Sequence, residues 1–239
     1  MKNTNFILRI LRILRVLRSY GLAVIMMWMV SCGGRQQGQR EQPVAEETSA
    51  QDVPEGWEPL MDGKTLAGWE IMRYGGEGEP YVKNGILTLP MAISGTSTGV
   101  EWVGDPLPKI NYAIYYEARR VDGNDIFGGI SFPYGDTFAT LIIGGWGGIV
   151  SGLSCIDGFD ASENETTKHV YFRDNQWYPV HLRVTPDSIR AVVDTIKVVD
   201  IATAGKRIHL RGGTNASSIT LNSYRSTGEI RNLRMKRLQ

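Results

Sequence analysis

The sequence has few of the residues that build several large protein classes. It contains two cysteines among 239 residues, and its basic and acidic side chains nearly balance at a formal net charge of +1. No basic face suited to a nucleic-acid backbone is therefore expected, and we expect no nucleic-acid partner. The glycine-rich run 144–148 does not have the spacing of a phosphate-binding or dinucleotide-binding loop. After the N-terminal segment no long apolar run occurs, so any membrane attachment must lie near the N-terminus.

That N-terminal segment has the features of an export signal. A basic stretch is followed by an apolar run over 21–30, too short to span a bilayer, and then by Ser31 and Cys32. A cysteine in this place resembles a bacterial lipobox, where the thiol is acylated. We predict a signal peptide over 1–31, lipidation of Cys32 and a polar tether over 32–53. An uncleaved amphipathic anchor is the alternative.

The predicted lipobox gives an expected location for the protein and determines whether its two cysteines are acylated, free or paired. A lipidated Cys32 places the protein in a bacterial cell envelope, with the membrane as a partner. Cys155 is then the only free thiol, so no internal disulfide can form. Because no catalytic-cysteine signature surrounds it, Cys155 is expected to be a small buried residue in a strand.

The remaining residues, 54–239, have the pattern of short strands. Asn84-Gly85 lies between two apolar runs and predicts a tight hairpin. Apolar residues alternate with polar ones over 111–121 and 178–185, with Tyr112, Ile114 and Tyr116 on one face. A dozen or so such runs, separated by turns, predict an all-β domain of two antiparallel sheets packed as a sandwich or jelly roll.

Acidic side chains gather at one place in this domain. Four carboxylates fall within nine positions, and a histidine follows them: Asp157, Asp160, Glu163, Glu165 and His169. Three interpretations stay open: acid and base groups of a sugar-cleaving site, ligands for a divalent cation such as calcium, or a solvated turn-forming loop. The spacing matches no specific metal motif.

Two further places carry candidate residues. Tyr134 and Asp136 lie on the turn that follows 127–132, and Asp136 is a candidate for the same groove as the acidic loop. Trp146 stands among four glycines, where an exposed indole stacks on a sugar ring or a buried one packs on a flattened strand. The candidate catalytic residues are thus Asp136, Asp157, Glu163 and His169, and the candidate substrate-binding residues are Tyr134, Trp146, Asp160 and Glu165.

The opening of the domain carries a resemblance to a known family. The run Gly56-Trp-Glu-Pro-Leu-Met-Asp-Gly-Lys-Thr-Leu-Ala-Gly-Trp69 resembles the hallmark of the 3-keto-disaccharide hydrolases, with Met61 in place of the usual Phe. The hairpin at Asn84-Gly85 and the closing run 228–238 also fit. The resemblance implies a concanavalin A-like jelly roll and cleavage of glycosides oxidised at carbon 3.

The function expected from these features is that of an exported, carbohydrate-active lipoprotein, facing either the periplasm or the cell surface. The resemblance favours a glycoside hydrolase or lyase that uses carboxylate acid and base chemistry without an organic cofactor. A ketone at carbon 3 acidifies the neighbouring C–H bond, so elimination of the glycosidic oxygen is a second route. The alternatives are a non-catalytic carbohydrate-binding module and a structural lipoprotein, because the fold alone does not decide between them. The sequence leaves the oligomeric state open.

Overall fold

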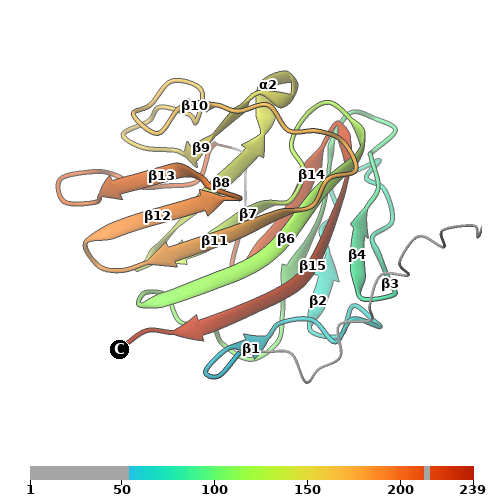
Figure 1. Ribbon diagram of the computed structural model, residues 1–239, viewed down its shortest axis with the longest axis horizontal. Coiled ribbons are helices and arrows are strands. Elements are labelled where there is room, and N and C mark those ends of the chain that lie inside the picture. Colours follow the sequence, from blue (N-terminus) through green and yellow to red (C-terminus); the bar gives the residue numbers. More distant parts are fainter. Residues whose placement is uncertain (1–53, 213–215) are drawn as a thin grey trace, which may run out of the picture. The chain divides into compact units, whose positions relative to one another are not determined.

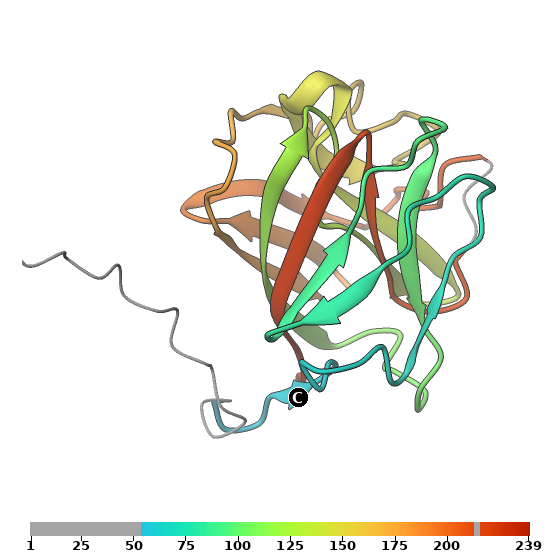
Figure 2. The ribbon, with the colours of Figure 1, turned by 90° about the vertical axis from the view of Figure 1, so that its right-hand side faces the viewer.

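The computed structural model describes residues 54–212 and 216–239. Within these residues fifteen strands form two antiparallel sheets, and the one helical element is the short turn α2 (Gly145–Gly148). Figures 1 and 2 show the two sheets packed face to face. This arrangement confirms the all-β sandwich predicted from the sequence.

The first layer, sheet A, lies in front in Figure 1 and has eight strands. Its order is β13 (Ile196–Ala202), β12 (Ser188–Val193), β11 (Tyr178–Val184), β6 (Tyr112–Gly123), β15 (Ser226–Arg237), β4 (Ile86–Leu89) and β3 (Tyr81–Lys83), and β1 (Glu58–Pro59) also pairs with β15. The two longest strands, β6 and β15, therefore form its centre.

The second layer, sheet B, lies behind and has seven strands. Its order is β10 (Lys168–His169), β9 (Val150–Ser154), β8 (Thr137–Gly144), β7 (Gly129–Tyr134), β14 (Thr220–Tyr224), β5 (Ser97–Trp102) and β2 (Trp69–Ile71). The chain passes repeatedly between the layers, so each sheet combines strands that are far apart in sequence.

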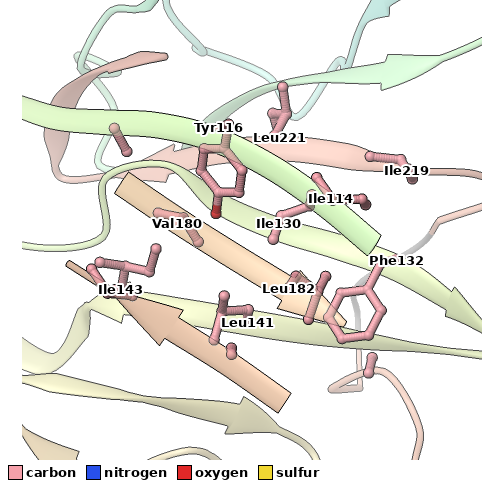
Figure 3. Close-up of a cluster of buried hydrophobic side chains, with 14 of the residues drawn as sticks. Ile114, Tyr116, Ile130, Phe132, Leu141, Ile143, Val180, Leu182, Ile219 and Leu221 are labelled. Atoms are coloured by element: carbon pink, nitrogen blue, oxygen red, sulfur yellow. The ribbon is translucent and has the colours of Figure 1, made fainter. Parts of the chain in front are cut away.

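The core lies between the layers and follows from the alternation in the strands. In β6 the side chains of Tyr112, Ile114 and Tyr116 are fully buried, while the residues between them face outward. Figure 3 shows Ile114 and Tyr116 of β6 packed with residues of β7, β8, β11 and β14. The phenol of Tyr116 donates a hydrogen bond to the carbonyl of Gly128 at 2.7 Å, which satisfies a polar group inside this core.

The predicted hairpin joins β3 to β4. Asn84 and Gly85 have φ angles of 52° and 78°, the left-handed values that a two-residue turn of this kind requires. Tyr81 then pairs with Thr88, and Lys83 with Ile86.

A β-bulge interrupts β15. Arg231 lies opposite Glu117 of β6, and Arg234 lies opposite Tyr115, so Asn232 and Leu233 together face one residue of β6. Asn232 has a φ of 57°. The extra residue changes which side chains face outward, and Arg231, Asn232 and Arg234 all avoid the core while Leu233 enters it. The bulge thereby places three polar side chains on one face.

The predicted signal peptide, Cys32 and the tether lie outside the described residues. Within 54–212 and 216–239 no helix is long and apolar enough to cross a membrane.

Candidate functional site

The acidic loop predicted from the sequence lies over the outer side of sheet B, next to β9. Its residue Thr166 accepts a hydrogen bond from the amide of Leu153 at 2.8 Å, and Asn164 donates one to the carbonyl of Leu153 at 2.7 Å. Ala161 packs in a small apolar cluster with Ile142 and Val150. The loop therefore covers part of sheet B.

Most of the loop's carboxylates have partners inside this local structure. Asp157 accepts a hydrogen bond from the backbone amide of Arg207 at 2.7 Å. Asp160 accepts hydrogen bonds from the Ser154 hydroxyl and from the Ala161 amide, the latter at 2.8 Å, and it pairs with Arg211 at 3.2 Å. These contacts favour the turn-forming interpretation of the loop.

The other two acids of the loop face solvent. Glu165 is exposed and forms an ion pair with Lys206 at 2.5 Å. Glu163 is exposed, and its backbone amide bonds to the carbonyl of Asp160 at 2.9 Å. Among the described residues no group of three or more histidine, cysteine or acidic side chains is arranged to hold a metal ion.

The other predicted site residues are divided between the two ends of β8. Asp136 is exposed at the turn before this strand, and Trp146 follows it in α2. Eight residues of β8 separate these ends by about 25 Å. His169 lies opposite Val150, which bridges to Gly145, so His169 is at the Trp146 end. The structure thus brings His169 toward Trp146 but keeps Asp136 away from both.

Two of these residues have local structural contacts. The phenol of Tyr134 donates to the carbonyl of Pro186 at 2.9 Å, which ties the β7–β8 turn to the β11–β12 turn. Trp146 is 39% exposed and has a φ of 50° within α2. Asp125 holds this turn, because its carboxylate accepts the Gly147 amide at 3.1 Å. The predicted catalytic and binding roles of these residues stay predictions.

The outer face of sheet A holds a different cluster of polar and aromatic side chains. It spans β11, β6 and β15, the strands at the front of Figure 1. The register places His181, Tyr115 and Arg234 in one row across the three strands and sets Glu117 beside Arg231 in the next. We call this group the outer-face cluster, and its members are Tyr115, Glu117, Arg119, Trp177, His181, Arg231, Asn232 and Arg234.

Glu117 is the centre of the outer-face cluster. Arg231 donates two hydrogen bonds to one carboxylate oxygen, at 2.8 Å from Nε and 2.7 Å from Nη2. The second oxygen accepts Asn232 at 2.8 Å and the phenol of Tyr115 at 3.1 Å. Burial acts to raise the pKa of Glu117, but the hydrogen bonds from Asn232 and Arg231 and the arginine charge outweigh it and lower the pKa. Glu117 is therefore a fixed, ionised carboxylate at neutral pH.

Aromatic rings and guanidinium groups surround this carboxylate. The guanidinium carbons of Arg119 and Arg231 lie 4.5 Å and 4.2 Å from the ring centre of Trp177. Arg234 lies between two rings, 4.2 Å from Tyr115 and 5.6 Å from Trp57. Its Nε atom is buried and has no hydrogen-bond partner among the residues that the structure describes. A ligand would therefore meet the terminal nitrogens of Arg234 and not its Nε, and guanidinium groups stacked on aromatic rings suit a sugar ring with its hydroxyls.

His181 supplies a titratable group next to them. Its ring centre lies 4.8 Å from that of Tyr115, edge to face. Burial and then the charge of Arg234 lower the pKa of His181, so the imidazole is neutral at pH 7. Burial and the charge of Glu117 raise the pKa of Tyr115, which keeps the phenol protonated. The outer-face cluster thus combines a neutral base, a hydroxyl donor and fixed cations.

Sequence reasoning did not select this cluster. His181 stands at a polar position of the alternating run 178–185 and is exposed, but this pattern alone assigns it no function. The signal lay in the outward half of the alternating run 111–121, where Tyr115, Glu117 and Arg119 stand between core residues. Their partners Arg231 and Asn232 are more than 110 positions away, so no local pattern joins them.

With the fold and these sites described, comparison with known proteins places the chain in a family. Residues 56–236 match the family of 3-keto-alpha-glucoside-1,2-lyase-like domains, and the chain belongs to this family. The resemblance carried by the opening motif is thereby confirmed. Among curated proteins, none matches the sequence.

Solved structures agree on the fold. A protein from Parabacteroides distasonis, named as a candidate glycosyl hydrolase, is 13% identical with a TM-score of 0.52, over 77% of this chain and 95% of that one. The Crh5 transglycosylase is 9% identical with a TM-score of 0.52, over 76% of this chain and 83% of that one. At these identities the likeness shows the fold alone. This fold is the concanavalin A-like jelly roll that the opening motif implied.

Proposed function

We propose that the protein cleaves glycosides whose sugar carries a ketone at carbon 3, and that the outer-face cluster is its active site. The observation that carries this proposal is the row of His181, Tyr115 and Arg234. In this row the neutral imidazole of His181 and the guanidinium of Arg234 lie 4.8 Å and 4.2 Å from the ring centre of one phenol, that of Tyr115. The family to which the chain belongs supports the substrate class and the 1,2-elimination.

The chemistry follows from the substrate's acidity. His181 takes the proton from carbon 2, and the electron pair of that C–H bond moves into the ketone to form an enolate. Arg234 stabilises the enolate oxygen by charge and hydrogen bonding. When the C=O bond re-forms, a C1=C2 double bond forms and the C1–O bond breaks. The glycosidic oxygen leaves with the electron pair and takes a proton from water, and the hydroxide formed takes the proton from the His181 imidazolium, which restores the base. A second water can then add across the C1=C2 double bond.

Glu117 has a positioning role in this proposal. All of its hydrogen bonds are taken by Arg231, Asn232 and Tyr115, so the carboxylate has no free lone pair for proton abstraction. It orients the Tyr115 phenol and the guanidinium of Arg231, and Trp177 holds that guanidinium from the other side. Because these donors are already held in place, little free energy is needed to reorient them when substrate binds.

The test compares variants on a 3-keto-disaccharide, with release of free sugar followed by NMR. His181→Gln and Arg234→Gln are each expected to lower kcat/KM by about 100-fold or more, the usual size for a lost acid-base or electrostatic group. Glu163→Gln and Asp157→Asn are the matched controls in the acidic loop, and they should retain turnover. If the loop variants lose turnover while the His181 and Arg234 variants retain it, the active site lies at the acidic loop and not at the outer-face cluster.

Isotopic substitution separates elimination from direct hydrolysis. A substrate deuterated at carbon 2 should react more slowly, and its deuterium should be lost to solvent. Turnover with no isotope effect and full retention of deuterium at carbon 2 would contradict the proposed role of His181.

A carbohydrate-binding module is the second candidate function. The observation that favours it is the saturated Glu117, since stacked arginines and aromatic rings without a free carboxylate suit binding alone. Glycan binding that Arg234→Gln abolishes, with no turnover of keto or ordinary glycosides, would establish this function in place of catalysis.

We also propose that the protein is exported and held on a bacterial membrane by lipid on Cys32. The signal-like order of basic, apolar and small residues before this cysteine supports the proposal. A mass spectrum of the mature protein should show Cys32 as the first residue, carrying acyl chains. Unmodified Cys32, or peptides that retain residues before it, would contradict the anchor.

A further inference from the structure

The outer face of sheet A carries more positive charge than its own carboxylates balance. Three of its acids are already paired: Glu117 and Glu229 at the centre with Arg231 and Arg119, and Asp200 on the edge strand β13 with Arg190 and Lys197. Three cations of the same face, Arg183, Arg234 and Lys236, form no ion pair with any of the described residues. Because the whole chain has a formal charge of only +1, this excess is local.

Two of these cations flank a small residue. Arg183 of β11 and Lys236 of β15 both lie opposite Ala113 of β6. Two strand spacings put their Cα atoms about 10 Å apart, with only a methyl group between them. Arg234 lies one row further along β15, beside the proposed base His181. On its other side Lys236 lies close to Gly56, where an added Cβ would be 3.3 Å from the lysine Nζ atom. The three cations therefore border one part of the face, next to the proposed active site.

This arrangement does not help the fold. Arg183 also lies directly opposite Arg190 of β12, and like charges in that position destabilise a sheet. Asp200 relieves Arg190 at 2.9 Å, whereas Arg183 has no such partner. Unpaired cations that cost stability and gather at one place are typical of a site that binds an anion.

We propose that these cations bind the carboxylate of a uronic acid, carried by the substrate glycan next to the bond that is cleaved. The inference rests on the proposed function, because it places an acidic sugar beside His181 and Arg234. Guanidinium and ammonium groups bind a carboxylate by charge-assisted hydrogen bonds, and the charge of the face also speeds the approach of an acidic glycan.

The test uses a glucuronic-acid tetrasaccharide and its methyl ester, which differ only in the charge of the carboxyl groups. Calorimetry should show that the wild-type protein binds the acid at least about tenfold more tightly than the ester, as one charged hydrogen bond predicts. The double variant Arg183→Gln/Lys236→Gln should lose that preference and leave binding of the ester unchanged. Raising the salt concentration should weaken binding of the acid and leave binding of the ester unchanged.

A matched control removes one arginine and one lysine elsewhere. The double variant Lys168→Gln/Arg207→Gln changes exposed side chains of β10 and of the segment facing the acidic loop, and it should keep the preference for the acid. If the wild-type protein binds acid and ester with equal affinity, the inference of a uronic-acid site is wrong, and the proposed function is unaffected. Turnover of a neutral 3-keto-disaccharide decides the proposed function separately, since His181 and Arg234 are intact in both double variants.

Discussion

Replacing Glu117 by glutamine should measure how much the outer-face cluster contributes to stability. The change keeps the shape of the side chain but removes the charge that binds Arg231 through two hydrogen bonds. The side chains of Arg231 and Glu117 are 32% and 14% exposed. Such a pair falls between exposed pairs, worth about 0–1 kcal/mol, and buried pairs, whose disruption costs about 3–5 kcal/mol. We expect a loss of about 2 kcal/mol from the free energy of unfolding.

Urea denaturation at pH 7 provides the measurement, with Glu163→Gln as the control for the same chemical change on an exposed loop. The control should stay within about 0.5 kcal/mol of the wild-type protein. The difference for Glu117→Gln should also depend on pH. Because the folded-state pKa of Glu117 is lowered, its contribution is present above the unfolded pKa of about 4.3 and is lost as the pH falls through the folded value. A loss below about 0.5 kcal/mol at pH 7 would refute the reasoning.

Three further outcomes are expected. Gly128→Ala should lower the free energy of unfolding by about 3 kcal/mol in a denaturation experiment. The residue has a φ of 64°, and the new Cβ would lie 2.6 Å from the Cβ of Ala118. An unchanged denaturation midpoint would contradict this packing. The value of kcat/KM should stay constant from pH 8 to about 6.5 and fall only at lower pH, because His181 acts as a neutral base with a lowered pKa. A fall in kcat/KM that begins above pH 7 would exclude this role of His181. Trp146→Ala should leave turnover within about twofold, because this residue lies in α2 beside sheet B, and a tenfold loss would restore its predicted stacking role.

Much of the fold was predictable because its determinants are local. The alternation in 111–121 and 178–185 corresponds to β6 and β11, and Asn84-Gly85 forms the turn it predicted. A period of two needs only neighbouring residues to be visible. The two-sheet architecture follows from many such runs, and the family motif at 56–69 indicates the jelly roll from the sequence alone.

The outer-face cluster could not be predicted in the same way. Side chains such as Tyr115 and Glu117 look like ordinary solvent-facing positions until the register of β15 is known. The acidic loop attracted attention because its carboxylates are dense in sequence, yet Asp157 and Asp160 bond to groups of their own surroundings. Side chains that are close in sequence need not converge in space, and side chains that converge in space can be far apart in sequence. Only the folded structure shows which side chains converge.

The bulge at Asn232 makes the length of β15 as important as its composition. Deleting this one residue would return the strand to strict alternation, with Leu233 and Met235 still toward the core and Arg231 and Arg234 still toward water, because the bulge adds one outward side chain without reversing the faces. A chain shorter by this residue would thus keep the other side chains of the cluster but lose the amide that binds the second oxygen of Glu117. That oxygen would then accept only the Tyr115 phenol, so this saturated carboxylate would regain a free lone pair.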